Sequence, residues 1–289
     1  MALFTDLQSL VQSRNPLDKS HIKLTCVANF YCNQLSIDMV TDLLRKYEGY
    51  PRDLLNHVEF IIVDDGSPLK YKIPQFSLNV TWLCINEDIK WNHAGAKNLG
   101  VVYAKSDKII ITDIDHDFPP ETLQYLVDGP HPGRYIYKFP RRDAKNYEKI
   151  ISHANTFFMS RARFMRHYGY DEEFAGHYGH EEYQFLRHHK YHGTKIRCLP
   201  EKYHCFHRVV DRDHSYHSLV RDLTYNESIV QRKRKEMQLF GVEQSQSRIF
   251  LNFTWQILYQ NRLEPLVPPL HRSWYFFGWL RRLSGYLSR

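Results

Sequence analysis

The sequence predicts an α/β fold, with a mainly parallel sheet flanked by helices. Short β-branched and apolar runs alternate with segments whose apolar residues recur at helical spacing. Acidic residues follow two of the apolar runs at once, as Asp64-Asp65 and as Asp113-Ile114-Asp115. Ligands of such sheets bind beyond the carboxyl ends of the strands. The sequence therefore predicts a functional edge at which both acidic pairs lie.

Size and composition allow a globular protein with an anionic partner. The chain has 289 residues, 43% of them hydrophobic, and a formal net charge of +7. A basic balance suits nucleotides, phospholipid surfaces or nucleic acid. The five cysteines are odd in number and form no CxxC pair, which favours reduced thiols in a cytoplasmic protein. We find neither a signal peptide nor a run of about 18 apolar residues.

The order of expected elements supports a parallel sheet. Residues 1–20 are expected to form a short helix and a linker. Apolar runs predict strands, and helical spacing predicts helices, in this order: strand 22–30, helix 34–47, strand 60–63, strand 80–85, helix 93–104 and a strand from Ile109. Strands that alternate with helices in this way favour α/β domains.

The run that begins at Ile109 ends in three acids at alternating positions: Asp113, Asp115 and Asp117. Crowded carboxylates repel one another and are costly to desolvate without a cation or donors. Oxygen ligands at this spacing suit Mg²⁺ or Mn²⁺, ions that commonly accompany a diphosphate. The alternative is an acidic turn, with Asp117 capping the helix expected from Pro119.

Four motifs occur in order between Thr25 and Asp117. They are Phe30-Tyr31-Cys32-Asn33, Asp64-Asp65-Gly66-Ser67, Ala96-Lys97-Asn98-Leu99-Gly100 and Asp113-Ile114-Asp115. In order and spacing this stretch resembles the nucleotide-binding half of a GT-A fold glycosyltransferase of family 2. The resemblance implies a hexosyltransferase-type enzyme that uses a nucleotide-sugar, with a UDP-sugar as the expected donor, and Mn²⁺ or Mg²⁺ as cofactor.

The resemblance also assigns roles to individual residues. Four would line the nucleotide base and ribose: Ala28, Asn29, Asp64 and Asp65. Lys97 would approach the diphosphate. Asp115 would be the firmer metal ligand, with Asp113 nearer the ribose or bound to the metal through water. Two departures affect these roles, because Ala28-Asn29 replaces the usual Pro and Lys97 replaces the commoner Arg, which donates in a bidentate manner.

The second half is expected to supply the catalytic base. Glu181 and Glu182 begin a predicted helix, where acids are favoured by the helix dipole for structural reasons alone. The family carries an acidic pair here, usually Glu-Asp, and its second acid is the base. The resemblance therefore implies Glu182 as the base, with Glu181 as the alternate, in an inverting displacement that deprotonates the acceptor hydroxyl.

A histidine after this helix is the expected further metal ligand. His204 matches the family's placement best, and His207 is the alternate. Imidazole beside carboxylates favours Mn²⁺ over Mg²⁺. Three other interpretations stay open: a contact with phosphate or sugar, a surface histidine, and a zinc site that adds Cys205.

The domain organisation follows from these assignments. Residues 21–215 would form the catalytic domain, divided into 21–118 for the donor and 119–215 for the acceptor and base. Residues 216–289 would be a helical extension. From Phe276 onward, aromatic and aliphatic residues share one helical face opposite arginines and serines, which is typical of a peripheral helix at a membrane surface. The alternative is a helix docked on the domain or on a second subunit.

A helix of that kind suits an acceptor that is a glycan or a lipid-linked glycan, as in polysaccharide biosynthesis at the inner face of a membrane. We weighed two other functions. A nucleotidyltransferase would more often carry a Gly-rich, Arg-containing loop after its first strand, and Phe30 to Leu35 has none. A basic module that binds lipid or nucleic acid without catalysis would not place acids at strand ends, so we expect no nucleic-acid partner.

Overall fold

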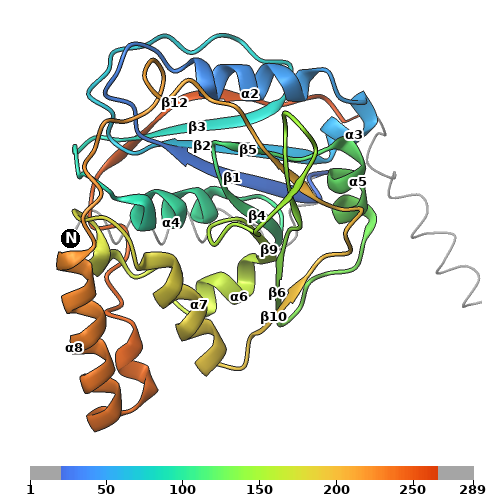
Figure 1. Cartoon of the computed structure of the whole chain (residues 1–289). Coiled ribbons are helices and arrows are strands. Elements are labelled where there is room, and N and C mark those ends of the chain that lie inside the picture. The colour runs from blue at the N-terminus through green and yellow to red at the C-terminus, as the bar shows by residue number, and fades with distance from the viewer. Residues whose placement is uncertain (1–20, 266–289) are drawn as a thin grey trace, which may run out of the picture.

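A central sheet of eight strands organises the protein (Figure 1), which a computed structural model describes over residues 21–265. The strand order is β10-β6-β9-β4-β1-β2-β3-β12. The strands are β1 (Leu24–Phe30), β2 (Val58–Asp64), β3 (Asn79–Ile85), β4 (Lys108–Asp113), β6 (Tyr135–Lys138), β9 (Phe157–Ser160), β10 (Lys195–Cys198) and β12 (Trp255–Asn261). The predicted α/β class with a mainly parallel sheet is confirmed.

A second, small sheet lies beside the first. It has the order β5-β11-β7-β8 and consists of β5 (His116–Asp117), β11 (Cys205–His207), β7 (Arg141–Asp143) and β8 (Lys149–Ile150). Because β5 follows β4 after two residues and β11 pairs with it, this sheet brings histidines from distant parts of the chain to the acidic end of β4.

Helices cover both faces of the large sheet (Figure 1). One face carries α2 (Asp38–Glu48), α3 (Arg52–Asn56) and α5 (Pro120–Asp128), and the other α4 (His93–Tyr103), α6 (Arg161–Arg166) and α7 (Glu181–Tyr191). Alternate residues of each strand face opposite cores, as Ile62 and Ile61 do in β2. A sheet buried on both faces explains why its strands read as continuous apolar runs.

The strand order places the functional edge. β1 pairs in parallel with β2 on one side and with β4 on the other, so the chain changes direction across the sheet between β3 and β4. Ligands of α/β sheets bind at such a switch point. In the register, Asn29 lies opposite Asp113, and Phe30 lies opposite Asp64.

The segment after residue 215 differs from the expected helical extension. The helix α8 (Thr224–Phe240) is present, although it begins later than residue 216. A short helix, η2 (Val242–Ser245), follows it, and then β12 pairs antiparallel with β3 at the sheet edge. β12 is largely exposed, so its sequence lacks the apolar run that marked the inner strands. The predicted elements at 1–20 and from Phe276 onward lie outside the described residues.

α8 is tied to the catalytic domain by buried polar contacts. Lys233, only 2% exposed, forms ion pairs with Asp171 at 2.8 Å and with Glu173 at 2.6 Å, beside and within the short helix η1 (Glu172–Phe174). Asn226 donates to the carbonyls of His177 and Gly179, which precede α7. α8 therefore supports the loop that leads to Glu181 and Glu182.

Two further sequence predictions can be compared with this structure. All five cysteines are free, as expected for reduced thiols. Between residues 21 and 265, no helix combines the length and the apolar character needed to cross a bilayer.

Candidate active site

A cavity of about 590 Å³ opens at the carboxyl edge of the large sheet. Its walls bring together residues from β1, from the end of β4 and from the start of α7. Five of the polar lining residues were singled out from the sequence: Asn29, Asp113, Asp115, Glu181 and Glu182. The cavity thus joins the acidic end of one strand to the acidic start of a helix more than sixty residues later in the chain.

Asp113 is held by three side chains. Lys97 Nζ lies 3.1 Å from its Oδ1, while Asn155 Nδ2 donates to its Oδ2 at 2.9 Å and His153 Nδ1 lies 3.6 Å from the same oxygen. Burial favours the neutral carboxyl, but the charge of Lys97 outweighs it, and the pKa of Asp113 lies below its usual range. Asp113 is therefore an anion at neutral pH.

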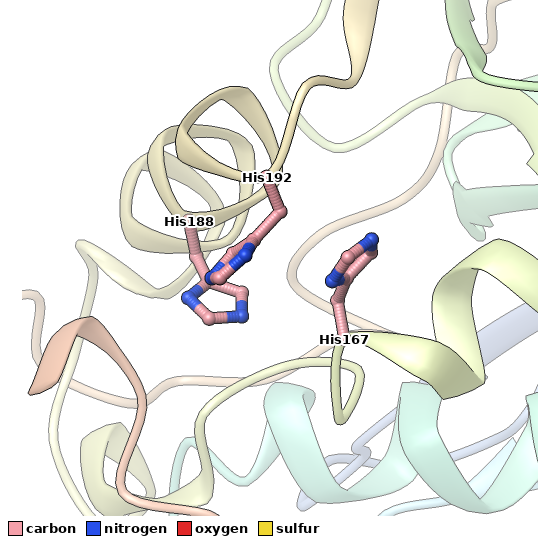
Figure 2. Close-up of side chains that lie close together, drawn as sticks. All are labelled: His167, His188 and His192. Carbon is pink, nitrogen blue, oxygen red and sulfur yellow. The ribbon is translucent and has the colours of Figure 1, made fainter. Parts of the chain in front are cut away.

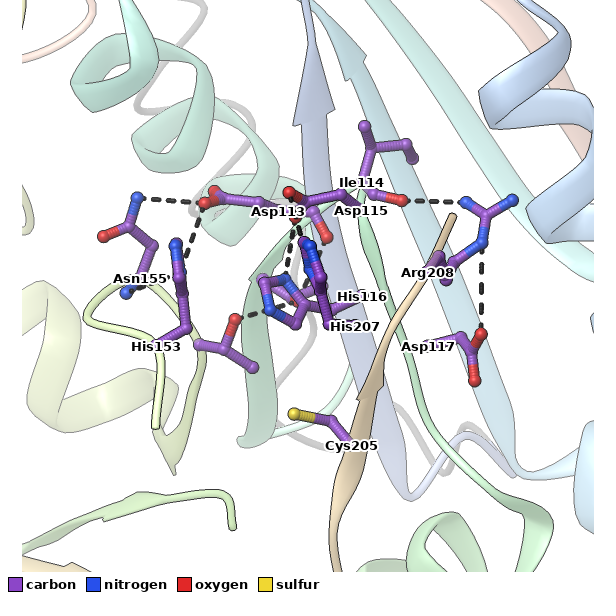
Figure 3. A network of polar contacts seen from close by, with 12 residues as sticks. Asp113, Ile114, Asp115, His116, Asp117, His153, Asn155, Cys205, His207 and Arg208 are labelled. Carbon is purple, nitrogen blue, oxygen red and sulfur yellow. Dashed lines mark hydrogen bonds and ion pairs between the residues drawn. The ribbon is translucent and has the colours of Figure 1, made fainter. Parts of the chain in front are cut away.

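Asp115 lies beside Asp113 and is surrounded by cationic and imidazole groups (Figure 3). His116 Nδ1 is 2.9 Å from its Oδ1, and Arg212 Nη2 is 3.2 Å from its Oδ2. Burial alone would raise its pKa, but the hydrogen bond and charge of His116 outweigh burial and keep the pKa well below its usual range. Two adjacent carboxylates are thus both ionised, as a divalent cation requires.

The protonation of His116 follows from its second partner. Arg141 Nη1 lies 3.3 Å from His116 Nε2, and a guanidinium can only donate. Nε2 therefore accepts, and the ring proton sits on Nδ1, facing Asp115. With both nitrogens engaged, His116 orients Asp115, and its own lone pair is not directed at the cavity.

His207 has the features of a metal ligand. Its Nδ1 is buried without a hydrogen bond and lies 3.9 Å from Asp115 Oδ2, too far for a hydrogen bond between them. Asp115, His116 and His207 form one of two groups in the described chain whose ligand atoms all lie close enough together to hold an ion. An unpaired imidazole nitrogen beside an ionised carboxylate fits Mn²⁺ better than Mg²⁺.

His204 is placed differently. It is not among the lining residues of the cavity, whereas His207 is. His204 stacks edge-on against Phe206, and its carbonyl accepts from Thr122. Along β11 successive side chains alternate between faces, so Cys205 and His207 share one face. Of the two histidines, the structure brings only His207 to Asp115.

Lys97 lies beneath the cavity floor. It is fully buried and bridges two acids, with Nζ 3.1 Å from Asp113 Oδ1 and 3.2 Å from Glu182 Oε1. Burial opposes its charge, but Asp113 and its other neighbours outweigh burial and raise the pKa of Lys97. The sequence predicted contact with a diphosphate. In this structure the ammonium instead links the end of β4 to the start of α7.

Glu181 and Glu182 occupy the first turn of α7, after His180 in a left-handed conformation with φ of 72°. Both side chains are buried, at 6% and 8% exposure. Burial and then the charge of Glu182 raise the pKa of Glu181 well above its usual range. Glu182 has Lys97 as a counterion, and Glu181 has no cation so near. Two adjacent carboxyls are thus placed in different environments.

The Asp-Asp-Gly-Ser motif forms the turn after β2. Asp64 accepts from the Ser67 amide at 2.9 Å and from the Tyr71 hydroxyl. Asp65 is 1% exposed, and burial raises its pKa well above the usual range, followed by the charge of Asp64. Neither acid lines the cavity, and neither does Ala28. Of the residues predicted to contact base and ribose, only Asn29 reaches it, and its Nδ2 lies 2.8 Å from His93 Nδ1.

Asp117 has a structural environment. Lys46 Nζ lies 2.8 Å from its Oδ2, and Arg208 Nε is 3.9 Å away, so it is turned from the other two acids (Figure 3). α5 begins without a side-chain cap, after Pro119. Asp117 therefore does not cap the next helix.

Sequence reasoning missed several cavity residues. His153 and Asn155, which contact Asp113, come from the loop before β9, and Arg212, Tyr216 and His217 come from the segment between β11 and α8. That segment crosses the mouth of the cavity, and its far end is fixed where Trp91 Nε1 donates to the carbonyl of Val220 at 3.1 Å. These residues lie in loops without periodicity, so no local sequence pattern marks them.

The family of the chain follows from comparison with known proteins. Residues 38–194, more than half of the chain, match the family profile described as glycosyl transferase family 2. The protein belongs to glycosyltransferase family 2. No curated protein matches its sequence.

Solved structures share its fold at low sequence identity. TarS 1–349 of S. aureus, in complex with UDP-GlcNAc, is 13% identical and has a TM-score of 0.52, with 75% of this chain and 67% of that one covered. The mannosyltransferase PcManGT of Pyrobaculum calidifontis, with GDP-Man and Mn²⁺, is 17% identical with a TM-score of 0.47, covering 83% and 69%. Drosophila beta1,4galactosyltransferase 7, with xylobiose, is 11% identical with a TM-score of 0.46, covering 72% and 79%.

Family membership and the shared fold confirm the expected class. The chain is a GT-A enzyme, a glycosyltransferase of the nucleotide-sugar-dependent type. The identity of the donor, the metal, the stereochemistry and the acceptor are taken up below.

Proposed function

We propose that this glycosyltransferase is metal-dependent and inverting, and that it moves a sugar from a UDP-sugar to a glycan or lipid-linked glycan. One observation carries the proposal. The ionised pair Asp113 and Asp115 faces the same cavity as the acidic pair Glu181 and Glu182. A donor diphosphate needs the first pair with a cation, and an attacking hydroxyl needs a base such as the second provides.

Asp115 and His207 would hold the ion, with Asp113 as a further or water-mediated ligand. When bound, Mn²⁺ or Mg²⁺ supplies positive charge that neutralises the departing diphosphate. Arg141 and Arg212 also line the cavity and add charge suited to phosphate. His204 was the first choice from sequence, but it does not reach Asp115, so we assign the histidine ligand to His207.

Glu182 would take the proton of the acceptor hydroxyl as that oxygen attacks the anomeric carbon. A carboxylate paired with Lys97 stays charged and is held at a fixed position. Glu181, with its raised pKa, is the alternate base. A single displacement inverts the configuration at the anomeric carbon, so inversion is the expected stereochemical outcome.

The donor would bind through residues 21–118 and the acceptor through residues 119–215. Asn29, Asp113 and Asp115 come from the first range, and Glu181 and Glu182 from the second. We also propose a cytoplasmic location at the inner membrane face, mediated by the amphipathic segment from Phe276 onward. Co-flotation of the full chain, but not of a chain ending at 265, with anionic vesicles tests that part.

A donor screen tests the enzymatic proposal. Purified full-length protein is incubated with UDP- and GDP-sugars and Mn²⁺, and released nucleoside diphosphate is measured. We expect turnover of a UDP-sugar that EDTA abolishes and excess Mn²⁺ restores. Turnover that continues at full rate in EDTA contradicts the metal assignment.

Matched variants separate the two acidic pairs. Asp115→Asn should lower turnover by roughly a thousand-fold because the ion loses its main ligand, and Glu182→Gln should do so while UDP still binds with Mn²⁺. Asp53→Asn and Glu201→Gln remove exposed carboxylates outside the cavity and serve as controls. Wild-type rates in either active-site variant would exclude the assigned role.

A further inference from the structure

Three histidines converge at the carboxyl ends of α6 and α7, away from the cavity. His167 follows the last residue of α6, while His188 lies in the last turn of α7 and His192 follows it. Figure 2 shows the rings of His188 and His192 projecting from α7 toward His167. We call these three residues the α6–α7 histidine cluster. The spacing of His188 and His192, four residues apart on one helix, puts both on one face.

The three rings share an arrangement that hydrogen bonding does not explain. Their ligand atoms lie within 4.8 Å of one another. In each ring Nε2 is buried and makes no hydrogen bond. Buried polar atoms nearly always have partners, so three adjacent nitrogens without one indicate a shared ligand.

Ser245 fixes the tautomer of His188. The Ser245 hydroxyl donates to the carbonyl of Val242 at 2.7 Å, so its oxygen is free to accept from His188 Nδ1 at 2.5 Å. The proton of His188 then sits on Nδ1, and the Nε2 lone pair is available. Metal-binding histidines are commonly oriented by such a hydrogen bond on the other nitrogen.

The cluster is in the neutral state that metal binding requires. Burial, followed by neighbouring cationic groups, lowers the pKa of His167 and of His188 to about 4. Neutral imidazoles packed together are unprotonated near pH 7, so a cation need not displace protons from them.

The surroundings offer a fourth ligand and access from solvent. Glu243 Oε1 lies 3.9 Å from His192 Nε2, and the side chains of His192 and Glu243 are 19% and 60% exposed. The carboxyl ends of two helices add partial negative charge. Arg163 is the nearby opposing charge, but its Nε and Nη2 already donate to Thr194 and to the carbonyl of His192.

We propose that His167, His188 and His192 bind one Zn²⁺ through Nε2, with Glu243 or water as the fourth ligand. Three imidazoles and one oxygen give the tetrahedral set that zinc prefers. The ion would join α6 to α7 and to the segment after α8. His192 is about 15 Å along the helix axis from Glu182, so this site is separate from the proposed active-site metal.

The test measures zinc binding in full-length protein. Every protein carries Asp115→Asn and His207→Asn, which remove the other candidate ligand set. The cluster variant adds His188→Asn and His192→Asn, and the matched control adds His131→Asn, an exposed histidine elsewhere. By calorimetry we expect one equivalent of Zn²⁺ in the background and control proteins, and binding at least about 100-fold weaker in the cluster variant. Equal binding in all three overturns the proposal.

Two further measurements do not depend on how well the double variant folds. His192→Asn alone changes a partly exposed side chain, and it should likewise weaken binding and remove the visible absorption of bound Co²⁺. X-ray absorption of zinc in the background protein should show three imidazole ligands and no sulfur. A spectrum with sulfur, or with fewer than two imidazoles, overturns the assignment.

Discussion

Replacing Lys97 with methionine tests how the two acidic pairs are held together. Lys97 is fully buried and lies 3.1 Å from Asp113 and 3.2 Å from Glu182. At those distances each pair is worth about 5 kcal/mol of Coulomb energy at an effective dielectric constant of about 20. Part of that energy offsets the desolvation of three charges. Removing one partner of a buried ion pair typically costs about 3–5 kcal/mol.

We expect the lower end of that range, about 3 kcal/mol, for the unfolding free energy of Lys97→Met. The side chains of Asp113 and Glu182 are 21% and 10% exposed to the cavity, so water partly compensates their charge. Urea unfolding followed by tryptophan fluorescence measures the loss. Lys46→Met, which removes an ion pair with a half-exposed lysine, is the control and should cost less.

The penalty should also depend on pH. In the wild type the pKa of Asp113 lies below its usual range, so its contribution to stability is present at neutral pH and is lost as pH falls through that low pKa. Without Lys97, burial would instead raise the pKa of Asp113. The variant then gains stability relative to the wild type as pH falls, and its penalty shrinks between about pH 7 and pH 5.

A double-mutant cycle gives the refuting result. Asp113→Asn in the Lys97→Met background removes the charge left unpaired, so the two changes together should cost clearly less than their sum. A penalty below about 1 kcal/mol for Lys97→Met, or one that adds to that of Asp113→Asn and does not vary with pH, would refute the reasoning.

Two other substitutions test local features of the site. Gly66→Ala should destabilise the protein by roughly 2–3 kcal/mol in urea unfolding, because φ is 73° and the added Cβ would lie 2.2 Å from the Glu87 carbonyl oxygen; Gly133→Ala, also at positive φ but with open space around it, should cost less. Glu181→Gln should stabilise the fold near pH 8 and lose that advantage toward about pH 4, because a raised folded pKa makes ionisation destabilising as pH rises; an advantage that grows on acidification would contradict the environment assigned to Glu181.

The inner strands and their acidic ends were predictable because burial on both faces leaves a local signature. Ile109, Ile110 and Ile111 are all fully buried, and such a run has few other interpretations. Asp113 and Asp115 follow it directly, so their place at the sheet edge comes from chain continuity. The convergence of Glu181 and Glu182 on the same cavity came from the family resemblance, since nothing local encodes it.

What the sequence could not predict depends on exposure or on contacts between distant segments. β12 is an exposed edge strand, so its apolar pattern is weak. His153 reaches Asp113 from a loop, and the choice between His204 and His207 depended on which face of β11 each occupies. Lys97 was expected at the phosphate because the family motif implies it, whereas its partners Asp113 and Glu182 are set by packing.

The central claim is that a divalent cation and a donor diphosphate share the end of β4. Crystals grown with UDP and Mn²⁺ allow a direct measurement by anomalous scattering at the manganese edge. The account predicts one strong peak within bonding distance of Asp115 and His207, with the diphosphate on its open side. Bound UDP with no manganese peak there, or a peak that neither residue contacts, would contradict it.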